Sequence, residues 1–378
     1  MRIDAITIHR VSMPLVTPFN TAFGDTTAVE SVLVRLQSGA VSGWGEAAPW
    51  RFPEYSPESA ASAFVTGRDM LAPIVLGTDI PSGADLQRRF SRFKGNQFAK
   101  AAFDLAWWDL AARLAGTPLH RMLGGTRTEV EVGADFGVME SVDALLSVMR
   151  QAVDAGFKRI KLKYRPGWDL DMLTAVRAAF PDTVIHVDCN SAYRLADIPM
   201  LEQLDRFGLA MIEQPLANDD LIDHAVLQKR VRTPICLDES ITSVDKARKA
   251  IDLGACGWIN IKPGRVGGIT NAVAIHDLCA ARGVPCWIGG MLESAVGGAH
   301  CLALATLPNI RYPSDIFPTD RFYARDLATP DMRLSAPSVM RVSEDPGIGT
   351  IPDEAMLARL SVEQAHLVAS NRPAVVGG

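Results

Sequence analysis

The chain has 378 residues, of which 48% are hydrophobic and 21% charged, and its formal net charge is −5 at pH 7. This length predicts two domains, at least one with a large core, and the acidic balance excludes the basic surface by which proteins bind nucleic acid. We find no apolar run of about 18 residues, as a membrane helix would need, and no signal peptide. We therefore expect a cytoplasmic protein, with its six cysteines reduced and buried rather than holding zinc or forming disulfides.

Residues 1–125 have the pattern of a separate α+β domain. Strand patterns cover Ile3–Leu15 and Ser31–Gln37, and two helices are expected at about 57–76 and 97–115. The second helix stops at a glycine with a proline just beyond. We expect this domain to cap whatever follows it.

From residue 129 onward the pattern changes to alternating strands and helices. Eight candidate strands lie at 130–137, 159–165, 184–190, 209–215, 234–240, 258–264, 285–290 and 310–315. Eight strands with helical crossovers predict an α/β fold, a (β/α)8-type TIM barrel, over residues 126–322. The alternative is a doubly wound open sheet, which normally has a glycine-rich turn after its first strand, and none is present. We expect residues 323–378 to return towards the capping domain, with a loose tail at 371–378.

Charged residues recur where the buried strands should end. The apolar runs RIKLK, VIHVD, LAMIE, PICLD and WINIK end at residues spaced 25, 25, 25 and 24 apart: Lys163, Asp188, Glu213, Asp238 and Lys262. Singly, such a carboxylate is usually a turn or capping residue and such a lysine is usually solvated. A barrel brings the carboxyl ends of its strands to one opening, so the equal spacing of all five favours a common site.

Three carboxylates at one opening would repel one another and raise their own pKa values. A divalent cation removes that repulsion, and a set of oxygen ligands without clustered histidine or cysteine suits Mg2+, with Mn2+ as a substitute. We therefore expect Asp188, Glu213 and Asp238 to bind the metal. Asn190 and Glu239 follow two of these ligands closely in the sequence, so we expect them to orient the ligands without binding the metal themselves.

The two lysines complete a proton-transfer site. Lys163 belongs to the second strand and Lys262 to the sixth, so they would face opposite sides of one α-carbon. A lysine acts as a base only when its pKa is lowered, and both the cation and the neighbouring Lys161 act in that direction. The cation would stabilise the enediolate formed when a carboxylate loses its α-proton. Two opposed bases permit racemisation, whereas one base and one cation suffice for syn elimination of water.

These motifs resemble those of the muconate-lactonizing subgroup of the enolase superfamily, over nearly the whole chain. The resemblance rests on Lys161-Leu-Lys163, Asp188-Cys-Asn190, Glu213-Gln-Pro215, Asp238-Glu-Ser240 and Lys262. It implies the same roles: Mg2+ on the three carboxylates, Lys163 and Lys262 as the acid/base pair, and Lys161 in support.

Within the subgroup, Pro166-Gly-Trp-Asp169, the stretch 261–268 and Gly289-Gly-Met-Leu-Glu-Ser294 look most like o-succinylbenzoate synthases and N-succinylamino acid racemases. A mandelate-racemase-like histidine is missing from 285–289, and the Asp-x-Asp of dipeptide epimerases is replaced by Asp315-Ile-Phe317. The chain also has Gly297-Gly-Ala-His-Cys301 where these relatives often have Gly-Arg-Ala-His-Asn.

Substrate selection should come from loops that cover the barrel mouth. The resemblance points to six residues of such loops as substrate contacts: Phe19, Phe23, Trp50, Tyr55, Gly290 and Met291. The leading function is thus that of a racemase or epimerase of an N-acyl or otherwise N-substituted amino acid, which is a small carboxylate substrate. We expect the protein to be a homo-oligomer. The alternatives are an o-succinylbenzoate synthase, a racemase of a betaine whose cation the loop aromatics surround, a Schiff-base lysine enzyme, and a non-catalytic barrel.

Overall fold

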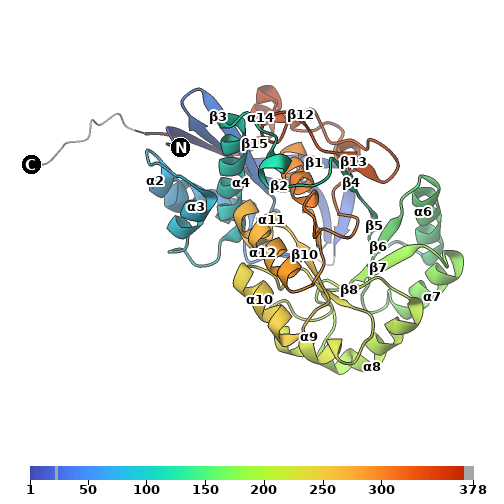
Figure 1. Ribbon diagram of the computed structural model, residues 1–378. Helices are drawn as coiled ribbons and strands as arrows, with labels where there is room; N and C mark the ends of the chain where they lie inside the picture. Colours follow the sequence, from blue (N-terminus) through green and yellow to red (C-terminus); the bar gives the residue numbers. More distant parts are fainter. Residues whose placement is uncertain (22–23, 370–378) are drawn as a thin grey trace, which may run out of the picture.

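The protein is described by a computed structural model that covers residues 1–21 and 24–369. One end is an antiparallel sheet in the order β15-β1-β2-β3 (Figure 1). Its strands are β1 (Ala5–Thr21), β2 (Gly24–Ser38), β3 (Val41–Ala47) and β15 (Ser361–Val368). The last strand comes from the far end of the chain and pairs with β1, with Ala5 opposite Val368.

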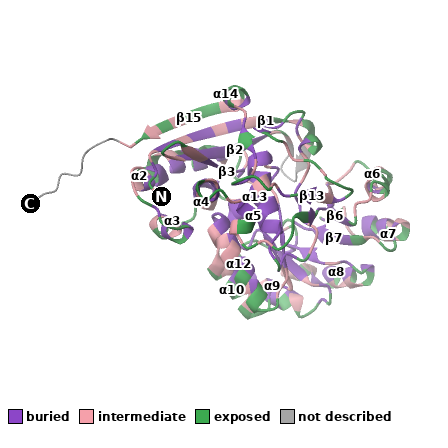
Figure 2. Cartoon of the chain, turned by 45° about the horizontal axis from the view of Figure 1, so that its top comes forward, coloured by how far each residue is buried: buried purple, intermediate pink, exposed green. Residues whose placement is uncertain are grey.

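Helices cover one face of this sheet. They are α1 (Ala60–Thr66), α2 (Ala72–Val75), α3 (Gly83–Phe90), α4 (Gln97–Leu114) and α5 (Leu119–Met122), with a π-helical turn at Gly67–Leu71. The long α4 lies against β3 and also contacts α11 and α12 of the second domain, so it is buried on almost every side (Figure 2). Gly43 and Gly45 of β3 allow this close approach, because a Cβ atom on Gly43 would lie 2.2 Å from the Leu110 nitrogen and one on Gly45 would lie 2.3 Å from the Ala102 oxygen.

The second domain is built on a parallel sheet in the order β11-β10-β9-β8-β7-β6-β5. Its strands are β5 (Ala134–Phe136), β6 (Arg159–Lys163), β7 (Val184–Asp188), β8 (Ile212–Glu213), β9 (Ile235–Leu237), β10 (Trp258–Ile261) and β11 (Cys286–Ile288). The helices between and after them are α6 (Val142–Asp154), α7 (Leu170–Ala179), α8 (Ile198–Leu201), α9 (Leu221–Gln228), α10 (Val244–Leu253), α11 (Pro263–Val266), α12 (Ile269–Ala281) and α13 (Ala295–Ala305). The expected (β/α)8-type fold with an α+β capping domain is confirmed.

Residues 309–315 close the barrel without forming a regular strand. Arg311 N donates to Cys286 O (2.9 Å) on one side, and Ser314 N donates to Glu131 O (2.9 Å) on the other. The prediction of a full strand at 310–315 is therefore wrong in detail, because this segment makes only isolated bridges to its neighbours. The prediction of one strand at 130–137 is also wrong: the stretch splits into β4 (Glu129–Glu131) and β5, and β4 pairs with β13 instead.

The chain after the barrel returns along both domains. Its elements are β12 (Ala328–Thr329), β13 (Val339–Arg341), β14 (Ile351–Pro352), α14 (Glu354–Leu360) and β15. The expected tail at 371–378 lies outside the described residues. All six cysteines are buried and unbridged, and no helix in the described ranges is long and apolar enough to cross a membrane.

The barrel interior changes character along its axis. Met211, Cys236 and Trp287 form a buried apolar cluster, with Trp258 and Tyr312 packed against it. Met211 and Cys236 precede Glu213 and Asp238 by two residues, so this cluster lies one layer below the carboxylates. The apolar layer therefore forms the floor of the opening.

Candidate active site

The structure brings the five predicted charged residues to one end of the barrel. Backbone pairing places Lys163 beside Asp188 and Asp188 beside Glu213. Asp238 and Lys262 follow β9 and β10 by one residue. Each therefore lies at the carboxyl end of its strand, where barrel enzymes hold their reactive groups.

Lys161 is the centre of an ion-pair cluster below the mouth. Its Nζ lies 3.1 Å from Asp188 Oδ2, 3.1 Å from Glu213 Oε2 and 3.0 Å from Asp315 Oδ2. Its pKa is well above the ordinary value because these carboxylates outweigh the lowering effect of burial. These ion pairs keep Lys161 protonated, and its contacts suit a supporting role.

Lys163 projects further towards solvent than Lys161. Its Nζ lies 2.8 Å from Asp188 Oδ2 and donates to Asn190 Oδ1, and 31% of its side chain is exposed. Asn190 in turn donates to Glu239 Oε1 at 2.9 Å, and its backbone nitrogen donates to Asp188 Oδ1 at 3.1 Å. The two residues expected to support the carboxylates are thus joined to each other and to the site.

Lys262 and Asp238 occupy the other side of the mouth. Lys262 Nζ lies 2.9 Å from Asp238 Oδ2 and 4.6 Å from the centre of the Tyr55 ring. The Tyr55 hydroxyl donates to Asp238 Oδ1 (3.1 Å) and accepts from Arg265 Nη1 (2.8 Å). Arg265 also forms an ion pair with Asp238. Asp238 is therefore held between two cations.

The pKa of Lys262 is raised, whereas a lysine that acts as a base needs a lowered pKa. Burial lowers this pKa, and Lys161 lowers it too, but Tyr55, Glu239 and Glu213 raise it by more. The pKa therefore stands above the ordinary value. Lys262 becomes a better base only if another positive charge takes over the carboxylates.

The carboxylate oxygens fit a hard cation in chemistry. Asp188, Glu213 and Asp238 are buried, Asp238 Oδ2 has the Lys262 ammonium as its ion-pair partner, and the buried Glu239 Oε2 accepts no hydrogen bond. Yet within residues 1–21 and 24–369 no three carboxylate, imidazole or thiol groups are arranged as a ready ligand set. Lysine ammonium groups contact these carboxylates instead, Lys161 at Asp188 and Glu213, and Lys262 at Asp238.

Several site residues were not predicted from the sequence. His186 Nε2 lies 3.3 Å from Glu213 Oε2, and Asn260 Nδ2 donates to Glu213 Oε1 at 2.8 Å. Each precedes a predicted site residue by two positions in the sequence and would lie on the same face of its predicted strand, so strand alternation alone would have found them. Arg265 had no comparable signal, because it reaches the site from a short helix. Asp315 ends the predicted strand 310–315, but its carboxylate was not assigned to the site.

A second ion-pair group lies beneath Lys161. Arg159 is fully buried, pairs with Asp135 at 2.7 Å and also contacts Asp315. Its guanidinium lies 5.7 Å from the ring centres of both Trp287 and Tyr312. Arg159 therefore connects the charged layer to the apolar floor.

Two loops meet over the mouth at the junction of the domains. Trp50 Nε1 donates to Met291 O at 3.0 Å. Trp50 and Leu292 both have positive φ angles, 71° and 62°, which cost energy in non-glycine residues and cluster at functional sites. Gly290 is adjacent and half-buried. The Phe19 side chain and Phe23 lie outside what the structure describes, so their expected roles stay predictions.

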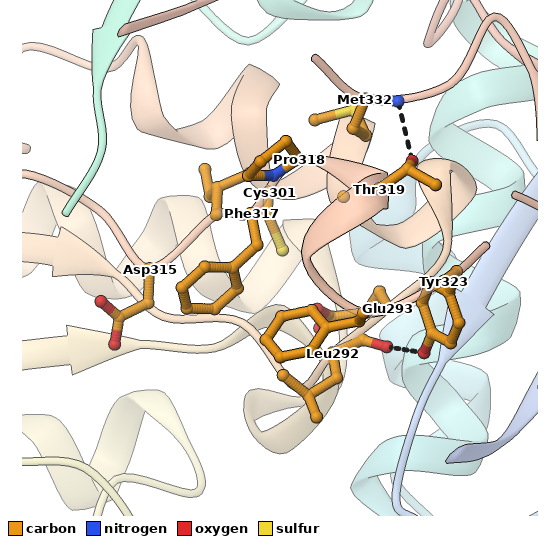
Figure 3. Close-up of a pocket in the computed structure, with 12 residues that line it drawn as sticks. Leu292, Glu293, Cys301, Asp315, Phe317, Pro318, Thr319, Tyr323 and Met332 are labelled. Carbon is orange, nitrogen blue, oxygen red and sulfur yellow. Dashed lines mark hydrogen bonds between the residues drawn. The ribbon is translucent and has the colours of Figure 1, made fainter. Parts of the chain in front are cut away.

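A pocket adjoins these loops on the side of the closing segment. Figure 3 shows its lining, with Tyr323 donating to Leu292 O and Asp315 at the edge. Phe317 and Phe322 form an edge-to-face pair with ring centres 5.1 Å apart. Because Asp315 also contacts Lys161, the pocket borders the ion-pair cluster.

A barrel with lysines and carboxylates at its strand ends, beneath an antiparallel capping sheet, defines an enzyme of the enolase superfamily type. The chain belongs to the mandelate racemase/muconate lactonizing enzyme family: its residues 3–124 match the model of that family's N-terminal domain, and 144–356 match the enolase C-terminal domain-like model. The resemblance stated from the sequence is thus confirmed.

Curated relatives with two different activities align over nearly the whole chain. An o-succinylbenzoate synthase of Geobacillus kaustophilus is 46% identical over 360 residues, covering 95% of this chain and 96% of that protein. An N-succinylamino acid racemase of Thermus thermophilus is 42% identical over 370 residues, covering 98% and 100%. The crystal structure of an enolase superfamily member from Listeria innocua has a TM-score of 0.94 at 36% identity, covering 98% and 100%.

Proposed function

We propose that this protein is a Mg2+-dependent enzyme that removes the α-proton of a small carboxylate, and that its leading reaction is racemisation of N-acylamino acids such as N-succinylamino acids. The observation that carries the proposal is the placement of the two lysines. Lys163 is the last residue of β6 and Lys262 follows β10, and the two strands lie four positions apart in a sheet that closes into a barrel. Their amines therefore approach the mouth from opposite sides, with the carboxylates between them.

Asp188, Glu213 and Asp238 are the residues that would hold Mg2+, the metal that members of this superfamily generally use. When bound, the ion supplies positive charge to the substrate carboxylate as its α-proton leaves. Binding there would also free Lys163 and Lys262 from their ion pairs with Asp188 and Asp238, and it would offset the carboxylate charges that now raise the Lys262 pKa. One lysine would then accept the α-proton, and the other would return a proton to the opposite face.

The remaining residues orient and enclose the substrate. Lys161, held by three carboxylates, would place its positive charge near the substrate carboxylate. Trp50 and Met291 close the mouth through their hydrogen bond and exclude water. The substrate's acyl part would lie against these two loops.

Formation of o-succinylbenzoate is the second candidate, because relatives of similar identity are named for it. In that reaction one lysine would remove the α-proton, and the other would remain a cation that stabilises the charge. The hydroxyl group would then leave on the same face as water, with the proton returned by the first lysine. The betaine alternative has less support, since the faces of Phe52 and Tyr55 already meet the cations of Arg51 and Lys262. The Arg51 side chain is 68% exposed, and its Nε lies 3.7 Å from Glu30 Oε1, so its cation already has a carboxylate nearby.

The test is isotope exchange in D2O with purified protein, first treated with EDTA and then supplied with Mg2+. Enantiomerically pure N-succinyl and N-acetyl amino acids are followed by proton NMR and polarimetry. We expect deuterium at the α-carbon with loss of optical rotation, only after Mg2+ is added. Full activity in EDTA would refute the proposal, and trapping of either lysine by borohydride would point to a Schiff base instead.

The second candidate is tested in parallel with the cyclohexadiene precursor of o-succinylbenzoate. A new ultraviolet-absorbing aromatic product without racemisation of any N-acylamino acid would replace the leading reaction by the synthase reaction. Both activities together would leave the two-lysine site intact and show that one site serves both.

A further inference from the structure

Gln214 sits between the strand ends that carry the three carboxylates. It directly follows Glu213 at the end of β8, its side chain is fully buried, and its φ angle is +38°. A positive φ angle is uncommon for a residue other than glycine and requires surrounding contacts to hold it. The contacts of Gln214 show what this conformation achieves.

The main chain of Gln214 is diverted from the sheet. Gln214 N donates to Cys236 O at 2.8 Å, as expected in a parallel ladder. In a regular ladder the next bond would run from Asp238 N to Gln214 O. Instead, Gln214 O accepts from Ser191 N at 2.8 Å, in the loop after β7. The left-handed turn therefore leaves the Asp238 amide without its regular main-chain acceptor.

The side chain of Gln214 takes the place of that acceptor. Its Oε1 accepts from Asp238 N at 3.0 Å and from Ser240 N at 3.2 Å. Its Nε2 donates to Ser240 Oγ at 2.7 Å and to Leu216 O at 3.1 Å. All the hydrogen-bonding capacity of the amide is used, and all of it is directed to the ends of β8 and β9.

We propose that Gln214 is the positioning residue of the metal site: one residue ties together the ends of β7, β8 and β9 and so fixes the spacing of Asp188, Glu213 and Asp238. This inference rests on the proposed function, because it assigns these carboxylates to a divalent cation. The main chain of Gln214 fixes the loop after Asp188. The side chain fixes the turn that carries Asp238 and Glu239, because it binds the backbone nitrogens of Asp238 and Ser240 on either side of Glu239.

The experiment measures Mn2+ affinity of the full-length protein directly, by electron paramagnetic resonance of free Mn2+ in a titration without substrate. Gln214→Met keeps the size of the side chain and removes all four hydrogen bonds. Gln214→Asn, which retracts the amide from both backbone nitrogens, is measured alongside it and decides the question if the methionine variant does not fold. Ser240→Ala is the matched control, because it removes one partner of Nε2 and leaves both contacts of Oε1.

We expect Gln214→Met to weaken Mn2+ binding about 10-fold to 100-fold, the usual effect of removing a group that orients metal ligands, and Gln214→Asn to weaken it by about 10-fold. Ser240→Ala should stay within about 3-fold of the parent protein, since the acceptor for the Asp238 amide remains. Val176→Ala, a core truncation in α7 away from the mouth, measures what loss of stability alone does to Mn2+ affinity.

Unchanged Mn2+ affinity in a folded Gln214 variant would overturn the inference. So would an equal loss in Val176→Ala at the same fall in melting temperature, because Gln214 would then be structural only. If the parent protein bound no Mn2+, the proposed function itself would fail and this inference with it, which is a different result from either of the other two.

Discussion

Replacing Glu46 by alanine should destabilise the junction between the two domains. Glu46 ends up fully buried, where its carboxylate accepts from Ser294 N (3.1 Å) and Gly297 N (3.0 Å) at the start of α13, and from the Ser31 hydroxyl (2.8 Å) of β2. The Ser294 hydroxyl donates to it as well. One side chain of the capping sheet thus holds the helix that follows the Gly289–Ser294 loop.

The size of the effect follows from the donors that the substitution leaves behind. Hydroxyl groups can rotate to other acceptors, but the two backbone N–H groups cannot, and each buried donor without an acceptor costs about 1–3 kcal/mol. Part of that cost is recovered because burial raises the pKa of Glu46 and so opposes its charged form. We therefore expect the free energy of unfolding to fall by about 3 kcal/mol.

Urea denaturation followed by circular dichroism measures this change as a shift of the midpoint at constant slope. Glu46→Gln should lose less, because its amide oxygen still accepts from one or two donors. Glu354→Ala removes a carboxylate that is 81% exposed and should change the unfolding free energy by no more than about 0.5 kcal/mol. If Glu46→Ala lowered the free energy of unfolding by less than about 1 kcal/mol, the reasoning would be refuted, because two buried N–H groups without acceptors cannot cost so little.

Three further predictions concern the mouth of the barrel. Lys163→Ala and Lys262→Ala should each abolish racemisation while retaining α-proton exchange from one enantiomer only, as read by NMR in D2O; a variant that still interconverts both enantiomers at the parent rate would contradict the two-base assignment. Mg2+ at 100 times its dissociation constant should stabilise the protein by about 2.7 kcal/mol, seen as a higher melting temperature than in EDTA, and an unchanged melting temperature would argue against a metal site. Trp50→Phe removes the hydrogen bond to Met291 O, which is worth about 1 kcal/mol, so KM should rise about 5-fold with kcat nearly unchanged; a fall in kcat alone would place Trp50 in the chemistry rather than in enclosure.

Much of the architecture could be predicted because it depends on local periodicity. Apolar runs ending in a charged residue every 25 positions imply repeated strand–helix units, and a closed barrel is the arrangement that buries eight such strands. The errors fall where this local signal is weak. Residues 130–137 have a continuous strand pattern, yet β4 pairs with β13 from the far end of the chain, a partner that no local pattern reveals.

The site residues also fall into those that local periodicity predicts and those that depend on distant contacts. Lys163, Asp188, Glu213, Asp238 and Lys262 could be found from their spacing, since parallel strands bring their ends together regardless of side-chain detail. The expectation that a bound cation lowers the lysine pKa stays a prediction. Among the protein's own groups, burial and Lys161 lower the pKa of Lys262, but Tyr55, Glu239 and Glu213 raise it by more. That balance depends on distances of about 3 Å between residues far apart in the sequence.

The sequence by itself determined the barrel, its cap and the five charged residues at the mouth, because strand periodicity and strand direction are local properties of the chain. Only the tertiary structure decided that Arg265 and Tyr55 hold Asp238, that Glu46 joins the domains, and that the Gln214 side chain replaces a main-chain acceptor. Such contacts join residues separated by dozens or hundreds of positions. Their energy comes from burial and hydrogen-bond geometry, which exist only once the chain has closed on itself.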